Sequence, residues 1–164
     1  PSRTDLKNPI LWLAHANALS EAATTLARTK PSWSNMPLSA RSICDSQFCA
    51  VALMLVGYSL EVCLKAMWIM KLGVEQYEQR ERQYLHHRIE ELADFIPTLD
   101  SRDRTILKLL THFVVWAGRY PDPGAKLEGA VEEIFMTAER EQIAGREVFD
   151  LAARVMKHAQ VVAP

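Results

Sequence analysis

The chain has 164 residues, of which 49% are hydrophobic and 24% are charged, a composition typical of one soluble globular domain and not of a disordered segment. Its 19 Lys and Arg residues are balanced by 20 Asp and Glu residues, which excludes binding to nucleic acid through a positive field of the whole molecule but leaves a local basic patch open. We therefore expect residues 1–164 to form a single domain.

The three cysteines, Cys44, Cys49 and Cys63, form no CxxC pair, so the sequence indicates neither a disulfide framework nor a metal site. On a helix Cys49 and Cys63 share one face, and we expect both to be small core residues. The longest charge-free run, 46–60, has 15 residues, fewer than the roughly 20 that span a bilayer, and no signal peptide opens the chain. These features predict a cytoplasmic protein with reduced thiols, without membrane insertion and without a metal or other cofactor.

The first helix is expected to begin at Asn8-Pro9, a capping side chain followed by proline at the first helical position, and to end near Lys30. Its apolar residues recur at every third or fourth position and so form one stripe: Trp12, Ala16, Leu19, Ala23 and Leu26. Two prolines make the following segment, 31–37, a loop, in which we expect Trp33 to be packed.

The second helix should begin near Ser39 or Ser42 and end at Gly73, which gives it more than thirty residues. Between residues 48 and 64 it is apolar on almost every face, the pattern of a helix enclosed by other helices. Gly57 inside this helix costs about 1 kcal/mol relative to alanine, which favours a close approach of another backbone at that position.

The charged stretch 74–88 is interpreted as a solvated connection or a ragged helix end. A short helix over 87–95 should bury Ile89, Leu92 and Ala93. The next helix, capped by Asp100 or Ser101 and ended by Gly118, carries its apolar face on Ile106, Leu109, Leu110, Phe113 and Trp116.

Two prolines and a glycine prevent a helix over 119–124. Two further amphipathic helices follow, the fifth on Leu127, Val131, Ile134, Phe135 and Ala138, and the sixth, after Gly145, on Val148, Leu151, Ala152, Val155 and Ala159. No period-two pattern of a β-strand persists anywhere. The sequence therefore predicts an all-α fold, a single bundle of about five to six helices around the long apolar second helix.

Glu61 and Lys65 are the only charged residues in the middle of the second helix, at the favourable i,i+4 spacing. They form either an ion pair that stabilises the bundle or part of a polar pocket that other loops also reach. Arg119, just beyond a helix end, either caps that helix or offers its guanidinium to a phosphate, with the ring of Tyr120 beside it.

His86 and His87 are adjacent, so on a helix their side chains point about 100° apart and do not ligate one ion. The usual outcome for such a pair is one satisfied and one exposed histidine. The sequence holds no Gly-rich phosphate loop, no nucleophile elbow and no HExxH, which excludes the common signatures of nucleotide hydrolases, serine hydrolases and zinc proteases.

Three segments in this order resemble the HEPN family, the higher eukaryotes and prokaryotes nucleotide-binding domain: 57–66 (GYSLEVCLKA), 86–92 (HHRIEEL) and 116–123 (WAGRYPDP). The resemblance spans about residues 45–160. It implies a helical bundle that forms a homodimer, works on RNA or nucleotides, and belongs to a toxin–antitoxin or phage-defence system with an antitoxin or a nucleotidyltransferase as partner.

Active members of the family are similar to metal-independent endoribonucleases that use an arginine and a histidine four to six residues apart. No histidine follows Arg119 at that spacing, so the candidate catalytic pair, Arg119 with His87, is rearranged in this chain. We expect a non-catalytic binding module, with an endoribonuclease toxin and a purely structural dimerisation domain as the alternatives. The expected polar groove is lined by Glu61, Lys65, His87, Arg119, Tyr120 and Asp122.

Overall fold

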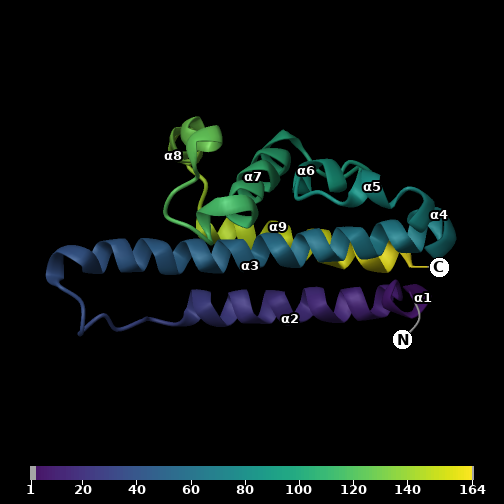
Figure 1. Ribbon diagram of the computed structural model, residues 1–164, viewed down its shortest axis with the longest axis horizontal. Coiled ribbons are helices and arrows are strands. Elements are labelled where there is room, and N and C mark those ends of the chain that lie inside the picture. The colour runs from purple at the N-terminus through teal and green to yellow at the C-terminus, as the bar shows by residue number, and fades with distance from the viewer. Residues whose placement is uncertain (1–2, 164) are drawn as a thin grey trace.

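The computed structural model describes residues 3–163 as helices joined by turns, with no strand in that range. Helix α3 (Leu38–Leu72) runs the length of the molecule, α2 (Pro9–Arg28) lies antiparallel to it, and α9 (Gly145–Val162) lies on another side (Figure 1). The predicted all-α bundle around a long apolar helix is confirmed.

Most of the shorter elements lie on the remaining side of α3, and the first of them lies beside the start of α2 (Figure 1). In chain order they are α1 (Arg3–Leu6), α4 (Val74–Gln79), α5 (Glu81–Tyr84), α6 (Ile89–Leu92), α7 (Ser101–His112), the π-helical turn η1 (Phe113–Ala117), the 3-10 turn η2 (Ala125–Leu127) and α8 (Glu128–Arg140).

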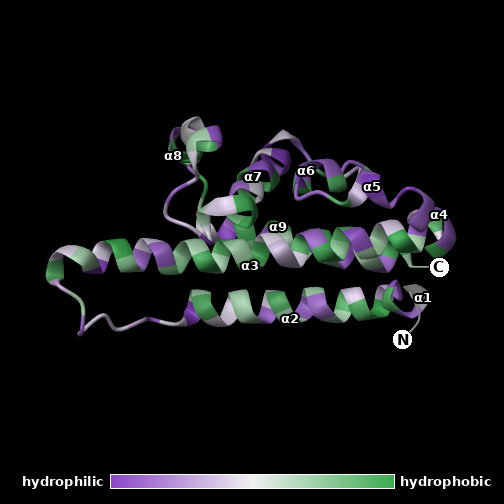
Figure 2. Ribbon diagram, in the orientation of Figure 1, coloured by the Kyte–Doolittle hydropathy of each residue, from purple (hydrophilic) through white to green (hydrophobic). Residues whose placement is uncertain are grey.

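The core lies where α3 meets α2, α6, α7 and α9, and the apolar residues of these helices face it (Figure 2). The predicted start of α2 is confirmed, since the Asn8 side chain accepts a 3.0 Å hydrogen bond from the backbone N–H of Ile10 and Pro9 takes the first helical position. All five residues predicted to face the core from α9 are buried, and all five of the α7 stripe are buried or half-buried. Helical periodicity therefore located the core faces of both helices.

Gly57 confirms the predicted close approach, because α7 and η1 pack directly against α3 there. A Cβ atom on Gly57 would lie 2.5 Å from Cγ2 of Val114 and 3.2 Å from the backbone oxygen of Leu110. Gly118, at the end of η1, is equally tight, since its Cβ would lie 2.3 Å from Cβ of Met54. Two glycines thus let the end of α7 rest on the surface of α3.

The stretch 74–88, interpreted as a solvated connection or a ragged helix end, is mostly exposed but more ordered and more buried than either alternative implies. The chain forms α4 and α5 there, and it buries Tyr77 and Tyr84, whose rings stack with centroids 5.2 Å apart. The short helix expected over 87–95 is confined to α6, although Ile89, Leu92 and Ala93 are buried as predicted. The structure therefore has more helical segments than the five to six expected.

The prediction that Cys49 is a core residue is wrong, because this residue is exposed. Cys63 is buried as predicted. The first turns of α3 extend past the ends of α2 and α9, so fewer neighbours cover them (Figure 1). Phe135, predicted to lie on the core face of α8, is 68% exposed. Trp33 is packed as expected: it donates to Asp45 at 2.6 Å and meets Phe48 edge to face.

Within the described part of the chain, α3 is the one helix long and apolar enough to cross a membrane by length and composition. Core helices of bundles have the same properties. The second half of α3, from Val56 to Ile69, is mostly buried by its neighbours.

Gly57→Ala should lower the free energy of unfolding by about 1–3 kcal/mol, although alanine is the better helix former, because the new methyl group overlaps Val114. Urea unfolding measures the change. Gly129→Ala in α8 is the matched control, since nothing lies within 4 Å of its Cβ position, and it should stabilise the protein by up to about 1 kcal/mol. A Gly57→Ala variant as stable as the wild type would contradict the close packing.

Candidate functional site

A buried ion pair lies in the middle of α3. The ammonium of Lys65 donates to Oε1 of Glu61 at 2.6 Å, and the two residues are 7% and 5% exposed. Removing both charges from water is costly unless every polar atom finds a partner. The Lys65 bond occupies only one carboxylate oxygen, so the other oxygen of Glu61 requires a donor from elsewhere.

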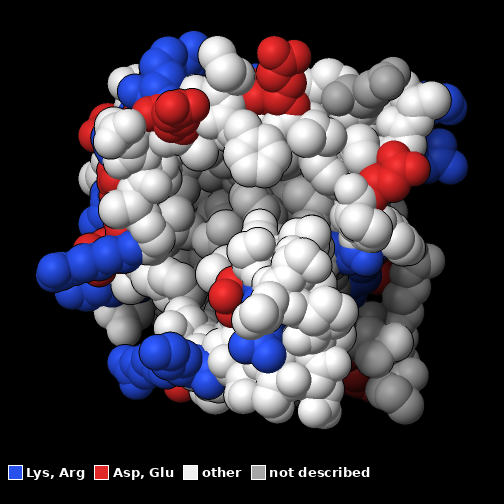
Figure 3. Space-filling model, turned by 90° about the vertical axis from the view of Figure 1, so that its left-hand side faces the viewer, with Lys and Arg blue, Asp and Glu red and all other residues white. Residues whose placement is uncertain are grey.

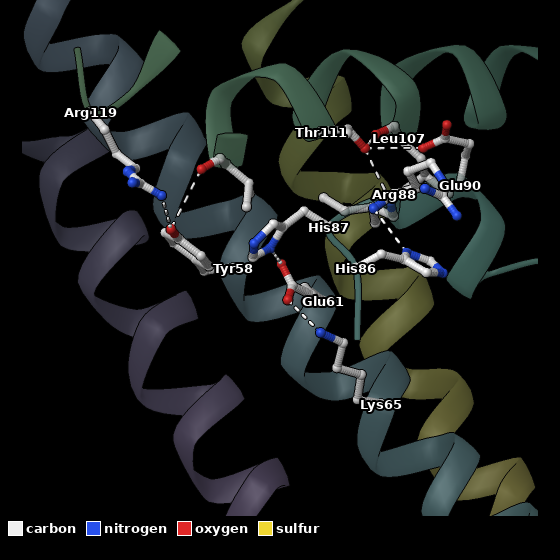
Figure 4. A network of polar contacts seen from close by, with 12 residues as sticks. Tyr58, Glu61, Lys65, His86, His87, Arg88, Glu90, Leu107, Thr111 and Arg119 are labelled. Atoms are coloured by element: carbon white, nitrogen blue, oxygen red, sulfur yellow. Dashed lines mark hydrogen bonds and ion pairs between the residues drawn. The ribbon is translucent and has the colours of Figure 1, made fainter. Parts of the chain in front are cut away.

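His87 provides this second donor. Its Nδ1 lies 2.9 Å from Oε2 of Glu61 (Figure 4). A carboxylate paired with Lys65 only accepts hydrogen bonds, so Nδ1 carries a proton, and in the neutral form of the ring the acceptor is then Nε2. The His87 side chain is 50% exposed. The site thus connects a buried carboxylate to a histidine that solvent and ligands can reach.

The segment that carries His87 is fixed by contacts on both sides. His86 accepts a 3.1 Å hydrogen bond at Nδ1 from the backbone N–H of Arg88. The N–H of Ile89 donates at 3.0 Å to the hydroxyl of Thr111 on α7, and that hydroxyl donates at 3.0 Å to Glu90 (Figure 4). These bonds hold the start of α6 against α7 and so fix the position of His87 over α3.

Arg119 reaches the same region from the end of η1. Its guanidinium donates at 3.4 Å to the hydroxyl of Tyr58 and at 3.4 Å to that of Tyr120, and it lies 5.2 Å from the centroid of the Tyr120 ring. The bonds to Tyr120 and then to Tyr58 raise the pKa of Arg119, and the guanidinium in turn lowers the pKa of Tyr120. Arg119 is exposed, and both of its long contacts are to tyrosine hydroxyls. These contacts position the guanidinium while its positive charge stays available to an anion.

Tyr58 is the site residue that the sequence analysis missed. It lies one helical turn before Glu61, and its hydroxyl also donates at 3.4 Å to the carbonyl of Val114 in η1 (Figure 4). Its place within the 57–66 segment of the HEPN resemblance was the available signal. Periodicity did not single it out, because an aromatic ring in an apolar helix is usually a core residue.

An aromatic cavity of about 270 Å³ adjoins Tyr120. It lies between the first half of α3 and the η1 and α8 segments, and its aromatic lining consists of Phe113, Trp116, Tyr120 and Phe135. The Nε1 atom of Trp116 is buried and has no hydrogen-bond partner in the described part of the chain. Tyr120 therefore contacts Arg119 and borders a space with flat, apolar walls.

The predicted site residues fall into three groups. Glu61 bonds to both Lys65 and His87, while Arg119 bonds to Tyr120 and to Tyr58, which precedes Glu61 by one turn of α3. Asp122 lies apart from this network: its Oδ1 accepts a 2.8 Å bond from the N–H of Gly124 and shapes its own loop. In residues 3–163 no three His, Cys, Asp or Glu side chains are placed to hold one metal ion.

Comparisons with protein-family models, with curated proteins and with solved structures give no significant match to this chain. The resemblance to the HEPN family therefore remains a prediction from the three sequence segments.

Glu61→Gln should lower the free energy of unfolding by about 3 kcal/mol, because it leaves the ammonium of Lys65 buried without a counter-charge. His87→Ala is the control from the same network and should cost about 1 kcal/mol or less, since this side chain is half-exposed. Chemical denaturation of both variants measures the difference. Equal costs would mean that the Glu61 carboxylate does not need to be charged.

Stability should fall in mild acid because burial, the largest cause, lowers the pKa of both His86 and His112 from 6.5. The fold favours their neutral forms, so their contribution is present above pH 6.5 and is lost as the pH falls through the lowered pKa values. We expect a lower urea midpoint at about pH 5.5 than at about pH 7.5, and a smaller loss in His112→Asn. The same loss in that variant would contradict a buried neutral His112.

Proposed function

We propose that this protein is a cytoplasmic RNA- or nucleotide-binding module that holds its ligand at the surface formed by Tyr58, His87, Arg119 and Tyr120, here called the arginine–histidine face. The observation that carries the proposal is the convergence of two ligand-accessible side chains, Arg119 and His87, on one stretch of α3. Both are held by hydrogen bonds to that helix, so their positions are set before a ligand arrives.

The chemistry of this face matches the parts of a nucleotide. The exposed guanidinium of Arg119 has donors left for a phosphate, which it recognises in forked geometry. The ring of Tyr120, 54% exposed, and the neighbouring aromatic cavity offer stacking surfaces for bases. The acceptor Nε2 of His87 suits a ribose hydroxyl. A chain of net charge −1 can bind RNA only through such a local set of contacts.

The HEPN resemblance supports the same proposal. Its three segments, 57–66, 86–92 and 116–123, contribute the side chains of the arginine–histidine face and the ion pair below it. By that resemblance we extend the proposal to a homodimer that works within a toxin–antitoxin or phage-defence system, beside an antitoxin or a nucleotidyltransferase.

A second candidate, a metal-independent endoribonuclease, is favoured by the bond between Nδ1 of His87 and Glu61. A carboxylate on Nδ1 leaves Nε2 free to take a proton from a ribose 2′-hydroxyl, and Arg119 would stabilise charge on the phosphate. The two long contacts of Arg119, at 3.4 Å, and the absence of a histidine four to six residues after it in the sequence favour binding over cleavage.

The decisive test combines binding and cleavage of RNA in EDTA. Fluorescence anisotropy with a labelled single-stranded RNA should show binding that weakens with salt, and Arg119→Ala should weaken it about tenfold. Arg140→Ala is the matched control, because Arg140 is an exposed arginine at the end of α8, away from this face, and should leave the affinity unchanged.

End-labelled total RNA should stay intact with the wild-type protein in the same buffer. Cleavage that His87→Ala and Arg119→Ala each abolish would establish the endoribonuclease instead. Neither binding nor cleavage at high protein concentration would leave the purely structural dimerisation domain as the remaining interpretation.

A further inference from the structure

A second and larger hollow lies on the other side of α3. The α2–α9 cleft, of about 1070 Å³, has α3 as its floor and the C-terminal part of α2 and the N-terminal part of α9 as its walls. In the end-on view uncharged side chains surround a central hollow, and both Lys or Arg and Asp or Glu side chains lie around its margin (Figure 3). The cleft is separate from the arginine–histidine face.

The cleft exists because its walls carry small side chains while its floor carries large ones. Ala27 from α2 and Ala152 and Ala153 from α9 leave the space between the helices unfilled. The larger apolar residues below and beside them are Phe48, Leu53, Val56 and Phe149. A long apolar trough of this kind is suited to a flexible hydrocarbon chain.

The charges of the cleft are concentrated at one end. Arg28 and Lys30, at the end of α2, line it and form no hydrogen bond or ion pair within residues 3–163. Arg146 lies across from them at the start of α9, where its contact with Asp150 is long, at 3.6 Å. The one acidic residue in the lining, Asp45, already accepts a bond from Trp33. This end of the cleft therefore favours an anionic group.

The start of α9 adds to this preference. Its N-cap residue, Ala144, makes no side-chain cap bond, so within residues 3–163 the backbone N–H groups of Gly145 and Arg146 have no side-chain partner, and the carboxylate of this first turn, Glu147, is paired with Arg102. Both α2 and α9 place their charged ends at the same end of α3 (Figure 1). Cations at one end and apolar walls along the rest match an amphipathic anion.

We infer that the α2–α9 cleft binds a long-chain carboxylate of the fatty-acid class. The carboxylate lies between Arg28, Lys30 and the start of α9, and the alkyl chain lies along the floor from Phe48 towards Val56. Neither the HEPN resemblance nor the arginine–histidine face enters into this inference, which stands or fails independently of the proposed function.

Cys49 provides a reporter, because its exposed thiol lines the cleft. Burial raises the pKa of the Cys63 thiol to about 12, so that residue does not compete for a thiol reagent. Cys44 is half-buried and is replaced by serine for the measurement. The rate of labelling in the Cys44→Ser protein then reports occupancy of the cleft around Cys49.

The experiment measures this rate with dodecanoate below its critical micelle concentration. Dodecanoate should slow the labelling of Cys49 in a saturable way, and dodecanol, which lacks the charge, should bind at least about tenfold more weakly. The double variant Arg28→Gln, Lys30→Gln should lose affinity for dodecanoate by about tenfold. Arg140→Gln, an exposed arginine of α8, is the matched control and should bind as the wild type does.

Ala153→Phe fills the cleft from an exposed position of α9 and should abolish the protection while the melting temperature stays unchanged. Because Cys49 also lines the aromatic cavity, protection that survives Ala153→Phe would place the ligand there and overturn the inference. The inference would also be overturned by equal affinity for dodecanol and dodecanoate, or by no protection of Cys49 at all. Protection that rises only with protein concentration would overturn it too, because it would show that a second copy of the chain covers the cleft.

Discussion

The position of the candidate site depends on one electrostatic constraint, the burial of Glu61 and Lys65 inside the apolar helix α3. An ion pair within one helix satisfies only part of the hydrogen-bonding capacity of its carboxylate. The remaining oxygen of Glu61 accepts from His87, which comes from a segment 26 residues further along the chain. The segment before α6 is therefore held from two sides, by the bond of His87 to the buried carboxylate on α3 and by the bond of Ile89 to Thr111 on α7.

The second constraint is steric and brings Arg119 to the same helix. Gly57 and Gly118 each remove a Cβ atom where α3 meets the end of α7. The end of α7 continues into the π-helical turn over 113–117, which holds one more residue per turn than an α-helix. Turns of this kind are common near functional sites. Arg119 leaves the turn beside Tyr58. Backbone contact at the glycines and side-chain contact at Tyr58 thus occur along the same face of α3.

Features of the fold that depend on local periodicity could be predicted from the sequence. Features that depend on contacts between distant residues could not. The core faces of α2, α7 and α9 follow from apolar spacing, and Gly57 indicated a close contact because glycine is unfavourable inside a helix. The burial of Tyr77 depends on its stacking with Tyr84 and on the turn between α1 and α2, since the ammonium of Lys7 lies 5.4 Å from its ring. Cys49 has the spacing of a core residue but faces the α2–α9 cleft.

The charged side chains of this protein are of two kinds: some are paired with an opposite charge inside the fold, and others remain available to a ligand. Asp103 shows the first kind: burial alone would raise its pKa, but bonds from Arg154 and from the backbone at Asp100 outweigh this effect and lower it. Arg154 is thereby committed to a carboxylate, at 2.5 Å. Arg119 meets only tyrosine hydroxyls, which leave its charge uncompensated. An arginine held by neutral partners keeps its full attraction for an anion, and this is the physical reason to look for ligands at Arg119 and not at Arg154.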